Sequence, residues 1–306
     1  MIIPIIRAYG DAVLLRHIRY LLAVADHGNF TRAAETLHVS QPALSQQIKQ
    51  LEGTLGVQLF DRSGRTVVLT DAGRVYLEYA RRSLRELDAG QQALMDVGDL
   101  SRGRLRLGVT PTFNEYLVAP LIDRFTALHP GVAIALTEMS LEQVVTALGN
   151  DALDLAIGFN GDHGPEVECQ PLFDETLCLV MGGPERPKPP SLSLADLQAL
   201  PFALLTPEFA TRRLVDTWCQ AQRFTPSIAL EANSIAILLK VVAQGRMATI
   251  LPRAIVGEQP ALHEVPLTLA LPRRTAALLR RSDAYRSVAS QAFVRLLHGE
   301  GRLHRS

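Results

Sequence analysis

The sequence predicts an α+β module at the N-terminus, a long helix after it, and a larger α/β part that forms the rest of the chain. Three observations support this fold class. Short helical patterns fill residues 16–56, one helical pattern runs from residue 71 to about 100, and strand and helix patterns alternate from residue 104 onward. A chain of 306 residues exceeds the usual size of one domain, so two or three folding units are expected.

The composition is that of an ordinary globular protein whose charge is unevenly distributed. Hydrophobic residues make up 47% of the chain, charged residues 20%, and the formal net charge is zero. Residues 16–85 nevertheless hold ten basic side chains against six acidic ones, a local charge of +4. This surplus permits nucleic-acid binding by the first segment, although the overall charge balance does not suggest it.

Cysteine content and hydropathy indicate the compartment. Cys169, Cys178 and Cys219 are too few and too scattered for a disulfide framework, which favours a reducing cytosol. No apolar run approaches the roughly 20 residues that cross a bilayer, and the opening residues resemble no signal peptide. We therefore expect a cytoplasmic protein without a membrane partner, and residues 1–13 form an extension with no assigned role.

Residues 14–70 predict three short helices followed by a two-stranded wing. Apolar residues at helical spacing define the helices. Glycines and capping residues mark where they begin and end: Gly28 after the first, Thr31 at the start of the second, Ser40 and Pro42 at the start of the third, and Gly56 at its end. Together these elements predict a winged helix-turn-helix.

The third helix has two chemically different faces. Leu44, Ile48 and Leu51 share the inward face, and the outward face carries Gln41, Ser45, Gln46 and Lys49. Amides and hydroxyls can bind base edges, while a lysine can bind a phosphate. The outward face therefore predicts a major-groove surface for double-stranded DNA. A merely solvated polar face is the alternative.

A turn at Ser63 and Gly64 separates two short alternating segments. The resulting wing would place Arg62 and Arg65 beside the DNA backbone or in the minor groove. After it, residues 71–100 predict a linker helix of about 28 residues, near 42 Å in length at 1.5 Å per residue, which suits pairing with a second subunit. An ordinary core helix is the alternative.

The run FTRAAETLHVSQPALSQQIKQLEGTLGVQLFDRSGRTVVLTDAG at residues 30–73 closely resembles the signature of LysR-type transcriptional regulators. The resemblance implies a homodimer or homotetramer that binds a promoter and contacts RNA polymerase. It also implies a set of DNA-binding residues: Thr31, Ser40, Gln41, Pro42, Ser45, Gln46, Lys49, Arg62 and Arg65.

The rest of the chain resembles one branch of that family, the activators of cyanate-degradation operons. Separate stretches carry this resemblance, among them DLSRGRLRLGVTPTF, EFATR at 208–212, EANSI at 231–235 and RTAALLRR at 274–281. It implies a cyanate-responsive activator with no cofactor besides its effector. A regulator of the same type that responds to a different small anion or a carboxylate is the alternative.

Residues 101–306 predict an effector-binding domain in which strands and helices alternate. By the resemblance, the chain forms two α/β lobes like those of periplasmic binding proteins, lobe I from residues 101–160 and 268–306 and lobe II from 161–267. Crossovers are expected near residues 161 and 267. A ligand between the lobes would lie beyond the carboxyl ends of the strands.

Polar residues follow the predicted strands at the starts of helices, where backbone N–H groups and the helix dipole favour an anion. Arg212 is expected to contact the ligand, and Glu208 to cap its helix. The expected effector-binding residues are Thr110, Thr112, Ser140, Thr206, Phe209, Arg212, Asn233 and Ser234. Simple helix capping is the alternative for Thr112, Thr206 and Asn233.

No catalytic or metal-binding motif is present: GxSxG, HExxH and a phosphate-binding Walker loop are all missing, and the eight histidines are dispersed. The sequence therefore indicates a regulator rather than an enzyme. A small-molecule-binding protein without a regulatory role is an alternative of another class, as is a thiol-based sensor, but no basic residues that would stabilise a thiolate surround Cys169 or Cys178.

Overall fold

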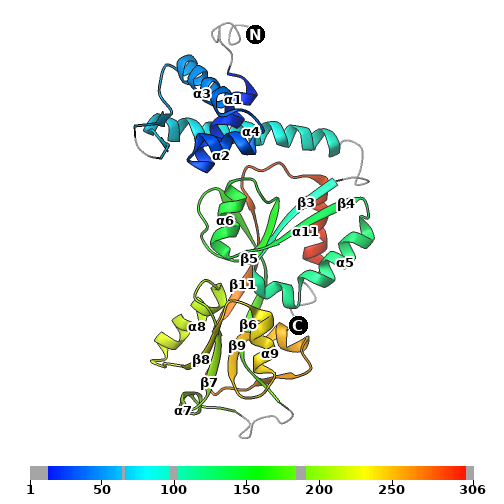
Figure 1. The fold of residues 1–306 in the computed structure, drawn as a ribbon. Coiled ribbons are helices and arrows are strands. Elements are labelled where there is room, and N and C mark those ends of the chain that lie inside the picture. Colours follow the sequence, from blue (N-terminus) through cyan, green and yellow to red (C-terminus); the bar gives the residue numbers. More distant parts are fainter. Residues whose placement is uncertain (1–12, 64–65, 97–102, 184–190, 301–306) are drawn as a thin grey trace. The chain divides into compact units, whose positions relative to one another are not determined.

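The computed structural model describes residues 13–63, 66–96, 103–183 and 191–300. It divides into two compact units, Met1–Gln92 and Ala93–Ser306, which are described separately below (Figure 1). The division falls inside a long helix, and the expected boundaries at residues 70 and 100 stay predictions. Within these described ranges, no helix combines the length and the apolar composition of a membrane span.

The N-terminal unit packs short helices and a small hairpin around one apolar core. The elements are α1 (Leu15–His27), α2 (Phe30–Thr36), α3 (Gln41–Leu55), the antiparallel strands β1 (Phe60–Asp61) and β2 (Val68–Leu69), and α4 (Asp71–Asp96). Leu21, Leu44 and Ile48 are fully buried in the core. Gly28 and Gly56 take left-handed φ values of 57° and 70° and end α1 and α3, as expected.

The start of α2 differs from the expectation that Thr31 caps it. The helix begins at Phe30, and the Asn29 side chain accepts hydrogen bonds from the backbone N–H groups of Thr31 and Arg32 at 2.8 and 3.1 Å. Both residue types can cap, but Asn29 has the extended backbone of an N-cap. Thr31 is thereby placed in the first turn of α2 with an exposed side chain.

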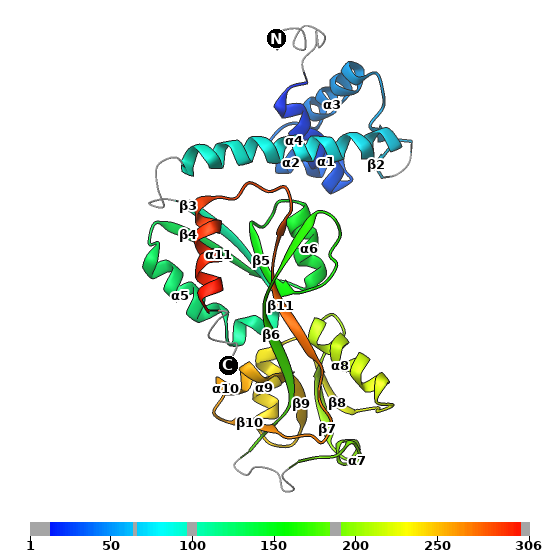
Figure 2. The same cartoon turned by 180° about the vertical axis from the view of Figure 1, so that it is seen from behind.

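Lobe I of the C-terminal unit is built on the parallel strands β3 (Gly103–Val109), β4 (Val132–Glu138) and β5 (Leu155–Phe159). The helices are η2 (Pro111–Glu115), α5 (Val118–Leu128), α6 (Leu141–Gly149) and α11 (Val288–Glu300). Leu155 and Ile157 pack in the core that contains α5 and α11, while Ala156 packs with α6. The helices therefore cover both faces of the sheet (Figure 2).

Lobe II repeats this plan with the parallel pairs β7–β8 and β7–β9. Its elements are α7 (Leu194–Gln198), β7 (Pro201–Leu205), α8 (Ala210–Ala221), β8 (Ser227–Ala232), α9 (Ile235–Val242), β9 (Ala248–Pro252), α10 (Arg253–Gly257) and β10 (Leu262–Val265). A loop is expected from the sequence for the proline-rich segment at residues 182–191, most of which lies outside the described residues.

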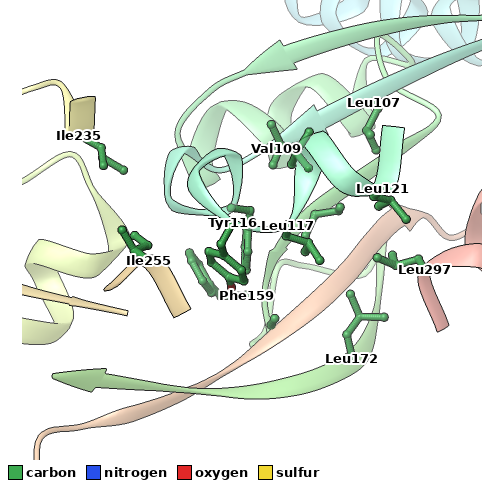
Figure 3. Close-up of a cluster of buried hydrophobic side chains, with 14 of the residues drawn as sticks. Leu107, Val109, Tyr116, Leu117, Leu121, Phe159, Leu172, Ile235, Ile255 and Leu297 are labelled. Carbon is green, nitrogen blue, oxygen red and sulfur yellow. The ribbon is translucent and has the colours of Figure 1, made fainter. Parts of the chain in front are cut away.

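Two long strands cross between the lobes, namely β6 (Val167–Gly182) and β11 (Arg273–Arg281). They pair antiparallel along the whole of β11, and β6 continues into lobe II, where it pairs with β9 and β10. The crossovers expected near residues 161 and 267 are therefore continuous antiparallel strands in an otherwise parallel arrangement. A single apolar cluster joins Leu107 and Val109 of lobe I to Ile235 and Ile255 of lobe II (Figure 3).

Candidate DNA-binding surface and effector pocket

The recognition helix α3 presents the two faces that its sequence predicts. Ser40 caps it by accepting a hydrogen bond from the Ala43 N–H group at 3.4 Å. Gln41, Gln46 and Lys49 are exposed, as is Pro42, and Ser45 is half-buried. The chemistry that faces solvent is therefore that of amides and an ammonium group, which suits base edges and phosphates.

Packing holds this helix rigidly from its inner side. Leu44, Ile48 and Leu51 are fully buried. On α1, the buried His17 accepts a hydrogen bond from the Leu14 N–H group through Nδ1 and therefore carries its proton on Nε2, 3.1 Å from Gln47 Oε1. Gln47 is thus engaged within the unit, which leaves the remaining outward residues of α3 for DNA.

The wing is anchored by a carboxylate that no local sequence pattern indicates. Glu52 of α3 accepts hydrogen bonds from the N–H groups of Leu59 and Phe60 at 2.9 and 3.2 Å and pairs with Arg62 at 2.9 Å. The Arg62 guanidinium also lies 4.9 Å from the centre of the Phe30 ring. These contacts fix the base of the wing against the recognition helix.

Arg62 therefore departs from its expected role as a DNA contact. Its guanidinium is engaged by Glu52 and Phe30, so its placement favours a role in positioning the wing. A side chain held in this way would have to give up an ion pair to reach a phosphate. Arg65, the other expected wing contact, lies outside the described residues.

Apolar side chains gather along one exposed face of the long helix α4. Val75, Tyr79, Leu87 and Leu94 are exposed at spacings of four, eight and seven residues, which places them on one face. A shallow hollow lined mostly by apolar side chains lies beside the start of this face, between Leu55 and Tyr79. The exposed apolar face agrees with the expected pairing of this helix with a second subunit.

In the C-terminal unit, a pocket of about 230 Å³ opens between the two lobes. Lobe I and lobe II both contribute to its lining: Thr110, Pro111, Thr112, Glu138, Met139, Ser140, Leu141, Gln143, Phe159, Glu208, Phe209, Ala210, Thr211 and Asn233. Five expected effector-binding residues line it, namely Thr110, Thr112, Ser140, Phe209 and Asn233. Thr206, Arg212 and Ser234 do not belong to this lining.

Buried hydroxyl groups form the floor of this pocket. Thr110, Thr112 and Thr211 are each only 2% exposed. Thr112 and Thr211 accept hydrogen bonds from the Arg274 guanidinium at 3.3 and 2.9 Å, so each hydroxyl retains its own hydrogen for a ligand. Thr110 Oγ1 has no hydrogen-bond partner among the described residues. A buried hydroxyl of this kind favours a ligand that accepts hydrogen bonds.

Arg274 joins the two lobes behind this floor, a role that no local sequence pattern indicates. It stacks on Phe159 with 3.8 Å between the guanidinium carbon and the ring centre, and Nε donates to the buried carboxylate of Glu175. Tyr116 donates to the same carboxylate at 2.6 Å, and burial raises the pKa of Tyr116 well above its usual range. The guanidinium is therefore held in place from both crossover strands and from lobe I.

Arg212 does not contact the pocket as expected. It is buried, and its Nε donates to Asp216 at 2.8 Å while Nη1 donates to the Leu205 carbonyl at 2.7 Å and to Glu231. These partners occupy the guanidinium within lobe II, away from the ligand space. Burial of a guanidinium group costs free energy unless the group is paired. The ion pairs of Arg212 therefore stabilise lobe II and do not bind a ligand.

The remaining polar residues cap helices at the edge of the pocket. Ser140 caps α6 by accepting from the Gln143 N–H group at 3.3 Å, and Ser234 caps α9 by accepting from Ile237 at 3.4 Å. Contrary to expectation, Glu208 does not cap α8, because the N-cap of that helix is Phe209 and no side chain caps it. Glu208 is exposed, and the neighbouring Thr206 hydroxyl holds the pKa of Glu208 below its usual range. Glu138, at the opposite edge, is also exposed, so water screens both carboxylates.

The cysteines are poorly suited to thiol chemistry. Burial raises the pKa of Cys178 to about 12 and that of Cys219 to about 11, so both thiols stay protonated at neutral pH. Cys169 is half-buried and donates to Asn160 Oδ1 at 3.4 Å. These surroundings do not favour the alternative of a thiol-based sensor.

Two family models match the chain. The model for the bacterial regulatory helix-turn-helix protein of the lysR family matches residues 15–74, and the model for the LysR substrate binding domain matches residues 98–302. The second match alone covers more than half of the chain.

Individual relatives extend over nearly the whole sequence. A probable RuBisCO transcriptional regulator of Trichormus variabilis is 31% identical over 291 residues, 91% of this chain and 86% of the relative. A hydrogen peroxide-inducible genes activator of Pectobacterium carotovorum is 31% identical over 276 residues, 87% of this chain and 90% of the relative. A full-length OxyR variant from Pseudomonas aeruginosa covers 95% of both chains with a TM-score of 0.69 and 26% identity.

Proposed function

The chain belongs to the LysR family of bacterial transcriptional regulators, and from this premise we propose that a small anion bound between its lobes controls transcription of a metabolic operon. It is a DNA-binding regulator with a substrate-binding domain, and not an enzyme. The expected cytoplasmic location follows from this, because a bacterial regulator meets its DNA there.

The observation that carries the proposed effector class is the floor of the interlobe pocket. The Thr110, Thr112 and Thr211 hydroxyls converge there, and the Arg274 guanidinium behind two of them supplies positive charge. The exposed carboxylates of Glu138 and Glu208 stand at the edge of the pocket in contact with water. A ligand with a negative group directed at the floor is therefore complementary to the buried part of the site.

The size of the pocket favours a carboxylate with several carbon atoms over cyanate. Cyanate has three non-hydrogen atoms and takes roughly the space of two water molecules, on the order of 60 Å³. The pocket of about 230 Å³ also accommodates larger carboxylates. Cyanate remains the candidate that the branch resemblance suggests, whereas the volume supports a carboxylate with several carbon atoms.

We infer that the effector acts by drawing the two lobes together. Thr112 on lobe I and Thr211 on lobe II share Arg274, so a ligand that binds both hydroxyls connects the lobes directly. An altered lobe arrangement would change the subunit contacts, the bend of the DNA and the surface presented to RNA polymerase. Dimer formation through the apolar face of α4 would set the spacing of the two recognition helices.

The test is the unfolding temperature of the full-length protein in a panel of sodium or potassium salts at constant ionic strength: cyanate, azide, bicarbonate, acetate and larger carboxylates. Selective, saturable stabilisation by one anion is expected, and Thr112→Val should remove it. If no anion stabilises the protein, or if Thr112→Val leaves the shift intact, the proposed effector class is wrong, while the family assignment is untouched.

A further inference from the structure

A second pocket, in lobe I, is lined by arginines and separate from the effector pocket. Its volume is about 220 Å³. The lining comes from the amino end of β5, the carboxyl end of β11 and the start of α11: Asp154, Leu155, Arg280, Arg281, Ala284, Tyr285, Arg286, Ser290, Gln291, Val294 and Arg295. Arg274 and Arg281 lie seven residues apart on β11, roughly 23 Å along the strand, so one small ligand cannot occupy both pockets.

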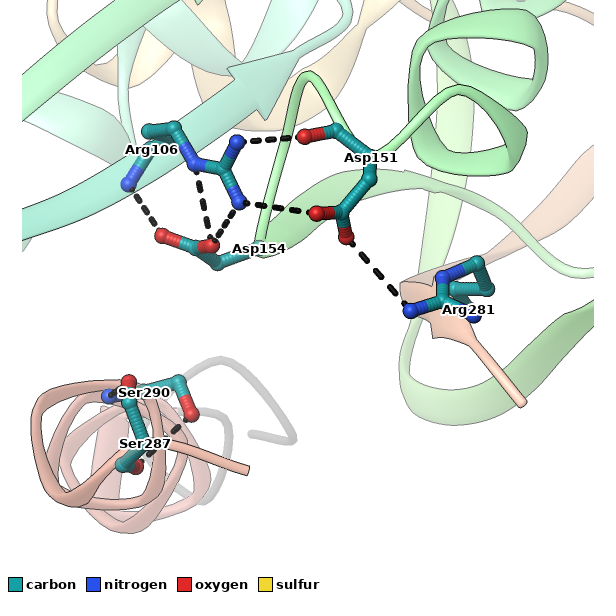
Figure 4. Close-up of polar contacts among 6 residues, drawn as sticks. All are labelled: Arg106, Asp151, Asp154, Arg281, Ser287 and Ser290. Atoms are coloured by element: carbon teal, nitrogen blue, oxygen red, sulfur yellow. Dashed lines mark hydrogen bonds and ion pairs between the residues drawn. The ribbon is translucent and has the colours of Figure 1, made fainter. Parts of the chain in front are cut away.

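The carboxylates near this pocket are already engaged by arginines. Asp154 accepts from Arg106 through its backbone N–H at 2.7 Å and its guanidinium at 2.6 Å (Figure 4). Glu168 accepts from Arg280 at 2.6 and 2.9 Å and from Arg286 at 3.2 Å. The hydrogen bonds from Arg280 hold the pKa of Glu168 below its usual range, so it stays ionised at neutral pH.

Positive charge nevertheless exceeds negative charge in this cluster. Arg106, Arg280, Arg281, Arg286 and Arg295 are five cations, and Asp151, Asp154 and Glu168 are three anions, which leaves a net charge of +2. No described carboxylate pairs with Arg295, and Arg286 is exposed. The excess charge calls for a ligand with more than one negative charge.

Arg281 gives an independent indication that the pocket binds a ligand. Its side chain is only 8% exposed, and its one ion pair among the described residues is a long one, 3.6 Å from Asp151 (Figure 4). Nε is buried and has no hydrogen-bond partner among the described residues. A buried guanidinium with an unused donor is costly, and an oxyanion in the pocket would relieve that cost.

The first turn of α11 adds the positive end of a helix dipole. Ser287 accepts a hydrogen bond from the Ser290 N–H group at 3.1 Å, and the Ser290 hydroxyl donates to the Ser287 carbonyl at 2.8 Å, which orders this turn (Figure 4). Ser290 and Gln291 line the pocket, so the positive end of a 13-residue helix faces it. Fork-shaped guanidinium groups beside a helix N-terminus suit a tetrahedral dianion.

We propose that this pocket, centred on Arg281, is a binding site for a phosphate group, either free or carried by a small phosphorylated metabolite. It is a second ligand site, distinct from the effector pocket and independent of the effector proposed above. The guanidinium groups of Arg281, Arg286 and Arg295 hold the phosphate oxygens, and the positive end of the α11 dipole faces the bound phosphate.

The test is isothermal titration calorimetry of the full-length protein with inorganic phosphate at pH 7.5, at an ionic strength held constant with sodium chloride. The probing variant is Arg286→Gln/Arg295→Gln, because both side chains are exposed and their loss spares the core. Saturable binding by the parent protein is expected, with Kd raised at least tenfold in the double variant. Arg281→Met, if it folds, should abolish binding.

Arg246→Gln is the matched control, because it removes an exposed arginine of lobe II that has no part in either ligand pocket or the DNA surface. It should retain the parent Kd. An unchanged Kd in the double variant, an equal loss in the control, or the absence of saturable binding would overturn the proposal. Acetate that binds as tightly as phosphate and loses the same affinity in the double variant would overturn the assignment to the phosphate class.

Discussion

Replacement of Thr110 by valine should stabilise the unliganded protein while it weakens effector binding. Thr110 is 2% exposed, and its hydroxyl has no hydrogen-bond partner among the described residues. Valine has nearly the same shape, and it tolerates the extended backbone found here, with φ −78° and ψ 143°. The substitution therefore removes an unsatisfied polar group without opening a cavity.

The size of the stabilisation follows from the free-energy cost of burying the Thr110 hydroxyl without a hydrogen-bond partner. A buried polar group without a partner costs about 1–3 kcal/mol, so a gain of about 1 kcal/mol in the free energy of unfolding is a conservative expectation. For a unit of this length, Ala93–Ser306, such a gain raises the unfolding temperature by about 2–4 °C. Thr112→Val should have the opposite sign, because it leaves a donor of Arg274 without an acceptor.

The assay is calorimetric unfolding of the full-length protein with and without the anion that stabilises it. Thr249→Val is the matched control: Thr249 is fully buried in β9 with an unpartnered hydroxyl among the described residues, but it does not line the pocket. Thr249→Val should stabilise the protein by a similar amount and leave unchanged the rise in unfolding temperature that the anion causes. If Thr110→Val destabilises the protein while Thr249→Val stabilises it, the Thr110 hydroxyl is satisfied without a ligand and the reasoning fails.

Further predictions concern the DNA surface and the cysteines. Gln46→Ala should lower specific DNA binding and spare most non-specific affinity, as measured by competition with random DNA; an equal loss of both would exclude base recognition. Lys49→Gln should reduce the slope with which the DNA-binding constant falls as the salt concentration rises, and an unchanged slope would mean that Lys49 contacts no phosphate. At pH 8, iodoacetamide should modify Cys169 before Cys178 and Cys219, because burial holds the pKa of the latter two at about 12 and about 11; rapid modification of either would contradict their burial.

The parts of the fold set by local patterns were predictable from the sequence. The cap at Ser40, the stop at Gly56 and the buried stripe of Leu44, Ile48 and Leu51 all depend on residues within one helix, and the structure places them as expected. The N-cap of α2 was not predictable from the sequence, because Asn29 and Thr31 are both good capping residues. Only the extended backbone at Asn29 shows which of the two caps the helix.

The effector pocket was predictable only in outline. Helix starts indicated Thr110, Thr112 and Ser140, since parallel strands bring their carboxyl ends together. Arg274 was missed because its contact with Thr112 spans 162 positions, a separation that no local pattern reports. Arg212 was misassigned for the same reason, since its partner Glu231 lies on the neighbouring strand rather than in the pocket.

The measurement that tests the central claim most directly is a DNase I footprint, with the DNA bend angle, on an operator selected from random DNA by the protein itself. It is made without and with the anion that the unfolding panel selects. The anion is expected to change the footprint and the bend in the parent protein and to change neither in Thr112→Val. Identical footprints and bend angles with and without the anion would contradict control of the DNA complex by the interlobe pocket.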